Sequence, residues 1–316
     1  MSGSRSISAG AEVRGVWPAL FTPLKNDDPK RLRNSLDFDK ARLIIDDLIA
    51  EGVSGLVPVG TTGQSPTVST EQHLDFIRFT VDYVNGRVPV IAGAGSNSTR
   101  ESVDMIQSIL KSFGDMAVLC VTGYYNNPPQ EGLAAHYETL SRETGAKIVL
   151  YNVPARTASY LEPDTLIRLA SDRNIIGLKQ AVDFRNPGKH RDDTARVVQS
   201  TKNLDFGIVS GEDDGVAAMM ELGGAGVITA SGSIELSAGT DVVAHEISIL
   251  TDNTARMQAG NAAAGDSGHI VIHALNDIYL DSSVTLTQPA STLNIVSDHG
   301  DFTLTKQFGI INTAGV

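Results

Sequence analysis

The chain of 316 residues is poor in cysteine, in aromatic residues and in basic charge. Its single cysteine, Cys120, excludes an internal disulfide framework and fits a reducing, cytoplasmic compartment. With 25 basic against 37 acidic residues, the net charge is −12, which disfavours nucleic acid and anionic membrane surfaces as partners. No apolar run reaches the roughly 18 residues that a membrane span needs. Residues 1–12 are small and polar, and we expect them to form a flexible N-terminal extension.

Residues 13–235 alternate short β-branched runs with longer stretches of helical period, which is typical of parallel βα units. Eight such runs begin about 20 to 40 residues apart, far enough for a crossover helix after each. A closed (β/α)8 TIM barrel therefore fits better than an open doubly wound sheet, and no GxGxxG fingerprint follows the first run. The runs are 15–24, 52–60, 88–95, 116–125, 147–154, 175–182, 204–211 and 224–231.

The composition changes in residues 236–316, which hold eight acidic and two basic residues and show the alternation of strands. A weak repeat of 23 residues aligns the segments Ile247-Ser-Ile249, Ile270-Val-Ile272 and Leu293-Asn-Ile295. The barrel is therefore predicted to be followed by a β-rich C-terminal segment. This repeat predicts stacked β-coils or a β-prism, and an irregular β-meander is the alternative.

Lys179 lies in the sixth run, IIGLKQAV, among residues that a barrel wall would bury. Burial disfavours the ammonium form and lowers the pKa of a lysine, so that the amine can form a Schiff base with a carbonyl substrate. The alternative is a lysine at a strand end whose ammonium group reaches solvent.

Other polar residues follow the ends of the predicted strands, where TIM-barrel enzymes bind substrate. The loop GTTGQS at 60–65 offers N–H groups and hydroxyls to a small carboxylate, although a turn with a helix cap would have the same sequence. Tyr124 and Tyr125 end the fourth run and Tyr151 lies in the fifth, so that two strands bring phenols suited to proton transfer to one rim. Arg156 suits a second carboxylate. Taken singly, packing at the rim is the favoured explanation of the tyrosines, and a surface ion pair is the favoured explanation of Arg156.

No metal site is predicted. His269 and His273 would lie about 13 Å apart along a strand, too far to share one ion. The acidic loop 212–214 after the seventh run is interpreted as a solvated turn, with cation binding as the alternative.

Together these motifs resemble the pyruvate-dependent class I aldolase family that includes dihydrodipicolinate synthase and N-acetylneuraminate lyase. The resemblance is closest to dihydrodipicolinate synthase and covers about residues 13–233, through GTTGQS, VPVIAGAGSN, YYNNPPQEGL, YNVPARTA, IIGLKQA and GAGVI in family order. It implies a lyase that condenses pyruvate with L-aspartate-4-semialdehyde in lysine and diaminopimelate biosynthesis, and Arg156 favours this reaction over sialic-acid cleavage. The alternatives are another 2-keto-acid aldolase or dehydratase that uses the same lysine, or an assembly protein with an auxiliary barrel.

The resemblance also implies residue roles, with no metal or organic cofactor. Lys179 would form a covalent imine with pyruvate, and Tyr125 would reach into the active site of a neighbouring subunit in a homodimer or homotetramer. The catalytic positions are Lys179, Tyr151, Thr61 and Tyr125. The substrate-binding positions are Thr62, Arg156, Gly211 and Ile228. The positions matching a site for lysine as feedback inhibitor, at the dimer interface, are Ser65, His73, Asn97, Glu101 and Tyr124.

The chain departs from the family pattern at several places. Gln180 stands where a glutamate commonly follows the Schiff-base lysine, and Ala158 where a glycine usually follows the Arg-Thr pair. Both changes concern substrate choice more than imine formation. Family members continue into an eighth barrel helix and further helices, which 236–316 do not resemble. Either part of 234–250, such as a short helix at 241–250, takes the place of the eighth helix, or another subunit covers the barrel there.

Overall fold

The computed structural model describes residues 13–25, 27, 34–184 and 188–229, and seven strands between residues 233 and 304. The chain divides into two compact units, Met1–Ala230 and Ser231–Val316. The division lies close to the change in composition after residue 235. The expected extension at residues 1–12 lies outside the described residues.

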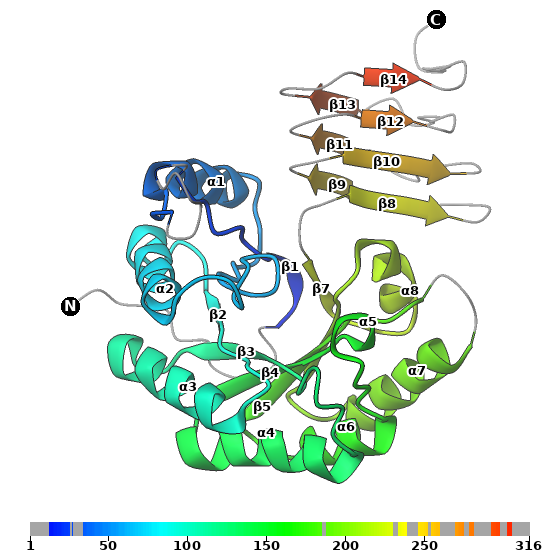
Figure 1. The fold of residues 1–316 in the computed structure, drawn as a ribbon. Helices are drawn as coiled ribbons and strands as arrows, with labels where there is room; N and C mark the ends of the chain where they lie inside the picture. Colours follow the sequence, from blue (N-terminus) through cyan, green and yellow to red (C-terminus); the bar gives the residue numbers. More distant parts are fainter. Residues whose placement is uncertain are drawn as a thin grey trace, which may run out of the picture. The chain divides into compact units, whose positions relative to one another are not determined.

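A curled parallel sheet forms the centre of the first unit, in the order β1-β7-β6-β5-β4-β3-β2 (Figure 1). Between β1 and β2, Val57 bridges to Ala19 and Leu56 bridges to Val90. The Ile91 N–H also donates to the Leu56 carbonyl at 3.0 Å. Residues 56–57 therefore form the second strand of the barrel between β1 and β2. They close the sheet, and the predicted (β/α)8 barrel is confirmed. The named strands are β1 (Gly15–Pro18), β2 (Ile91–Gly93), β3 (Ala117–Val121), β4 (Lys147–Asn152), β5 (Ile175–Gln180), β6 (Gly207–Ser210) and β7 (Gly226–Thr229).

The helices lie outside the sheet and begin and end at residues that suit those positions (Figure 1). Ser69 and Gln72 form a capping box at the start of α2, and Gly145 ends α4 in the left-handed conformation with φ 65°. The helices are α1 (Phe38–Ala50), α2 (Thr70–Val84), α3 (Thr99–Phe113), α4 (Gln130–Thr144), α5 (Pro154–Thr157), α6 (Pro163–Leu169), α7 (Lys189–Thr201) and α8 (Val216–Glu221). None of the helices in the described residues is long and apolar enough to cross a lipid bilayer.

Two hydrophobic clusters lie on the two sides of the barrel wall. In β4, Val149 and Tyr151 belong to the cluster inside the barrel, together with Trp17. Ile148 and Leu150 belong to the cluster between sheet and helices. Side chains of a strand alternate between its faces, so the inner residues of each strand are available to a site within the barrel.

The second unit contains parallel strands in two sheets, in the orders β14-β12-β10-β8 and β13-β11-β9. Consecutive strands alternate between the sheets, as in stacked β-coils (Figure 1). The register aligns Ile249 with Ile272 and Ile272 with Ile295, so that the 23-residue repeat sets the spacing between stacked strands. The strands are β8 (Ser233–Ala238), β9 (Glu246–Thr251), β10 (Thr254–Ala259), β11 (His269–Ala274), β12 (Ile278–Leu280), β13 (Thr292–Ser297) and β14 (Phe302–Leu304).

The described part of residues 234–250 belongs to β8 and β9. The expected short helix at 241–250 is therefore wrong for residues 246–250, and 241–245 lie outside the described residues. The β-branched and alternating sequence of β8 and β9 favours pairing with β10 and β11 over helix formation.

Candidate active site

A β-bulge sets the direction of Lys179 in β5. The pairing of β4 with β5 shifts between Ile148–Ile175 and Val149–Gly177, which leaves Ile176 as an extra residue. Ile176 belongs to the cluster inside the barrel. A Cβ at Gly177 would lie 3.3 Å from the Cγ1 of Val13, another inner residue, so positions 176 and 177 both face inward. The alternation that follows directs Lys179 into the barrel.

Lys179 is buried there, with 4% of its surface exposed, and its ammonium group does not extend into solvent. Its Nζ lies 4.3 Å from the centroid of the Tyr151 ring. Burial lowers the pKa of Lys179 to about 8, while the charges of Glu212 and Asp213 oppose the shift and Arg156 adds to it. Near neutral pH, part of the lysine population is therefore the free amine that attacks a carbonyl carbon.

Tyr151 faces the same space from β4 and is paired in register with Lys179. Burial and the charge of Glu212 raise the pKa of Tyr151 to about 12, and a hydrogen bond with the Thr61 side chain opposes that rise. The phenol is thus protonated at neutral pH. Tyr151 thus contacts both the Thr61 side chain and the amine of Lys179.

Two of the other predicted substrate-binding positions, Gly211 and Ile228, lie beside this pair. Gly211 directly follows β6, and a Cβ there would lie 2.6 Å from the Cβ of Ala181 and 3.0 Å from the Cε of Lys179. Ile228 on β7 is fully buried inside the barrel. Thr62 is half-buried in the loop after the second barrel strand. In that loop the Gln64 N–H donates to the Thr61 carbonyl at 3.0 Å.

Arg156 is carried by the short helix α5 just beyond β4, and its side chain is exposed. Pro154 begins this helix at a position where a missing N–H costs nothing. Ala158 ends it with φ 56°, in the left-handed region that favours glycine. A glycine at this position would adopt the same conformation without strain.

A cleft of about 600 Å³ brings Thr61 and Arg156 together with most of the predicted inhibitor positions. In it, the His73 Nε2 lies 2.7 Å from the Gly93 carbonyl and therefore carries the proton, and burial lowers the pKa of His73. Glu101 accepts a hydrogen bond from the Ser96 hydroxyl at 2.8 Å. The predicted residues that line the cleft are Thr61, Arg156, Ser65, His73, Glu101 and Tyr124.

Two predicted residues are not brought into this arrangement. Asn97 is half-buried but does not line the cleft. Tyr125 is 90% exposed and has φ 72°, so that within one chain its ring does not pack against Tyr151. A strained, exposed aromatic residue at this rim is compatible with contact to another subunit.

The sequence interpretation missed the influence of the acidic loop on Lys179 and the burial of two amide side chains. Glu212 and Asp213 follow β6 and act electrostatically on Lys179. The backbone N–H of Glu212 donates to the Ser210 hydroxyl, and the Thr229 hydroxyl donates to the Asp213 carboxylate. The signal in the sequence was that Glu212 and Asp213 directly follow β6, which is adjacent to β5, the strand that carries Lys179. Among the described residues, no group of three or more His, Cys, Asp or Glu side chains is arranged to hold a metal ion. The buried amides are those of Asn152 and Gln180, which follow Tyr151 and Lys179 in their strands.

Comparison with known proteins places this geometry in a family. The chain matches the model of the dihydrodipicolinate synthetase family over residues 12–287, further than the expected end of the resemblance at residue 233. It is 40% identical, over 70% of this chain and 71% of the relative, to the 4-hydroxy-tetrahydrodipicolinate synthase of Aromatoleum aromaticum.

Solved structures show the same likeness. A crystal structure of dihydrodipicolinate synthase matches with a TM-score of 0.61 and 43% identity, over 69% of this chain and 70% of that one. The chloride-inhibited dihydrodipicolinate synthase of Acinetobacter baumannii, solved with pyruvate, matches with a TM-score of 0.61 and 34% identity, over 68% and 69%. This chain belongs to the dihydrodipicolinate synthetase family.

Proposed function

We infer that the protein is a lyase of the class I aldolase type. It condenses pyruvate with L-aspartate-4-semialdehyde to form 4-hydroxy-tetrahydrodipicolinate, a step of lysine and diaminopimelate biosynthesis. The observation that carries this function is the buried Lys179 amine facing the Tyr151 phenol, in a chain whose relatives bear the synthase name. The same relatives favour this reaction over another keto-acid aldolase and over an assembly protein.

The reaction follows from the chemistry of the amine. Lys179 Nζ attacks C2 of pyruvate, and loss of water gives an iminium ion that withdraws electrons from C2. The methyl group then loses a proton, and the resulting enamine carbon attacks the aldehyde of the second substrate. The amino group of that substrate finally attacks the iminium carbon, which closes the ring, breaks the bond to Lys179 Nζ and releases the free amine. Tyr151 and Thr61 transfer the protons, Thr62 and Arg156 bind the two substrate carboxylates, and no metal or organic cofactor takes part.

In this proposal, a second subunit supplies a further residue to the group that transfers protons. The exposed Tyr125 contacts the active site of a neighbouring copy in a homodimer or homotetramer, which its 90% exposure in the single chain supports. A cytoplasmic location is proposed on the basis of the single free cysteine, Cys120.

Lysine is proposed as a feedback inhibitor at the cleft. Glu101 offers a carboxylate to its ammonium group, and the neutral His73 adds no repelling charge. Titration of the protein with L-lysine, followed by calorimetry, tests this site. We expect Glu101→Gln to weaken binding about tenfold or more, because a charge-assisted hydrogen bond is lost.

Borohydride trapping tests the proposed activity directly. Incubation with pyruvate and borohydride should reduce the imine to a stable adduct, which peptide mapping should place on Lys179. Lys179→Arg keeps the positive charge but should give no adduct. An adduct elsewhere, or none on the wild-type protein, contradicts the proposed function. Turnover with L-aspartate-4-semialdehyde and with N-acetylneuraminate then identifies the second substrate.

A further inference from the structure

Two buried amides lie directly behind the candidate catalytic pair. β4 and β5 pair Tyr151 with Lys179 and, one step further, Asn152 with Gln180. Because side chains alternate along a strand, the first pair faces the barrel interior and the second faces the helices. Asn152, Gln180 and the Thr194 side chain on α7 are all fully buried.

Hydrogen bonds fix the orientation of both amides. The Leu161 N–H donates to Asn152 Oδ1 at 3.0 Å, so Asn152 Nδ2 is the donor that reaches Gln180 Oε1 at 2.9 Å. Gln180 Nε2 in turn donates to Thr194 Oγ1 at 3.2 Å, and the Thr194 hydroxyl donates to the His190 carbonyl at 2.7 Å. Each group in this amide chain has one direction, and reversal of either amide would place two donors or two acceptors against each other.

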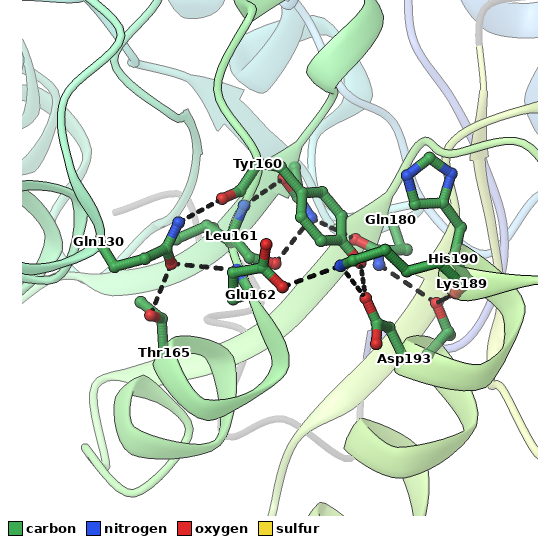
Figure 2. A network of polar contacts seen from close by, with 11 residues as sticks. Gln130, Tyr160, Leu161, Glu162, Thr165, Gln180, Lys189, His190 and Asp193 are labelled. Carbon is green, nitrogen blue, oxygen red and sulfur yellow. Dashed lines mark hydrogen bonds and ion pairs between the residues drawn. The ribbon is translucent and has the colours of Figure 1, made fainter.

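Further contacts join the two ends of the amide chain, which are the segment around Leu161 and the first turns of α7. Figure 2 shows Leu161 between Tyr160 and Glu162, with Lys189 and Asp193 of α7 beside them. Lys189 Nζ contacts Glu162 at 2.9 Å and Asp193 at 2.7 Å, and the Tyr160 hydroxyl donates to Asp193 at 2.9 Å. The segment before α6 and the first turns of α7 therefore form one support for the ends of β4 and β5.

We propose that Asn152 and Gln180 are positioning residues, which hold Tyr151 and Lys179 at the separation that imine formation requires. The inference rests on the proposed function of Lys179. A fixed pair of strand ends keeps the amine directed at the substrate carbonyl and keeps it away from water. Loss of this constraint would change the rate and the protonation of Lys179, not only the stability of the fold.

α7 offers a matched pair of substitutions that leave both strands unchanged. Thr194 and Thr201 are both buried and both donate to the carbonyl four residues earlier, Thr201 to Val197 at 2.9 Å. Thr194 additionally accepts from Gln180. Thr194→Val removes that acceptor, Thr201→Val is the control for a lost buried hydroxyl, and Thr194→Ser keeps the acceptor.

The rate of borohydride-trapped imine formation with pyruvate is measured against pH for each variant. We expect Thr194→Val to slow imine formation about tenfold at saturating pyruvate, since small displacements of a reacting group have effects of this size. Its pH midpoint should rise from about 8 toward that of a hydrated lysine. Thr201→Val and Thr194→Ser should keep the wild-type rate and midpoint.

Equal rates and midpoints for Thr194→Val and Thr201→Val would overturn the positioning role. A common loss of rate in both valine variants, matched by their thermal midpoints, would also overturn it, because the effect would then be structural. A wild-type protein that forms no adduct with pyruvate instead rejects the proposed function, so the two failures are distinct.

Discussion

Gly211 lies against Lys179 so closely that a Cβ at position 211 would be 3.0 Å from the lysine Cε and 2.6 Å from the Cβ of Ala181. Gly211→Ala should therefore displace the lysine side chain and slow pyruvate trapping at least about tenfold. Thermal unfolding and circular dichroism check that the variant is folded. A folded variant with the wild-type trapping rate would show that the space beside Lys179 is not required.

The pH dependence of imine formation should report the environment of Lys179. Its rate should rise with a midpoint near pH 8, because the free amine is the reactive form. Glu212→Gln removes a charge that raises the lysine pKa, so the midpoint should fall and the rate at pH 7 should increase roughly two- to threefold. Asp205→Asn, at the exposed opposite end of β6, removes the same charge and should leave the midpoint unchanged. A midpoint near 10.5 in the wild type would contradict a buried amine.

Lys179→Met should abolish trapping but stabilise the fold at neutral pH. Since the folded pKa of about 8 is below the unfolded value of 10.5, burying the ammonium group lowers stability below pH 8, and this cost disappears as the pH rises to 10.5. The gain in unfolding free energy should be up to about 3 kcal/mol at pH 7. Denaturant titrations at pH 7 and pH 10 measure it. A gain that does not shrink at pH 10 would assign the effect to packing instead.

Ala158→Gly should stabilise the protein by about 1 kcal/mol, because Ala158 holds a left-handed conformation with φ 56° at the end of α5. Gly145→Ala, at the end of α4 with φ 65°, is the reverse change and should destabilise by a similar amount. Thermal denaturation of both variants provides the comparison. Opposite signs are expected, and equal signs would exclude backbone strain as the cause.

Ile272→Pro should disrupt the second unit. Ile272 lies in β11, which pairs with β9 on one side and β13 on the other, so the lost N–H interrupts the centre of a ladder. We expect a loss of about 2–3 kcal/mol or more, seen as proteolysis within 231–316, while trapping at Lys179 continues. Ile272→Val keeps the N–H and should leave the segment resistant to protease.

The strand ends and their polar residues could be read from the sequence because the barrel places consecutive strand ends on one rim. The direction of Lys179 could not, because the bulge depends on a shift in pairing between Val149 and Gly177 that no local pattern encodes. The sequence predicts a solvated turn for the loop that contains Glu212, for a related reason. Only the pairing of β5 with β6 brings this loop close enough to influence Lys179. Asn152 carries no signal in sequence, and Gln180 is noted there only in connection with substrate choice. Packing against Leu161 and α7 gives both amides defined partners.

The pairing of β1 with β7 has a consequence for synthesis of the chain. β1, the first strand to leave the ribosome, can pair with β7 only after Gly226–Thr229 have been translated. Until then, the nascent sheet keeps two open edges that can pair with other chains. A premature stop before Gly226 should therefore yield an insoluble product and not a smaller working enzyme.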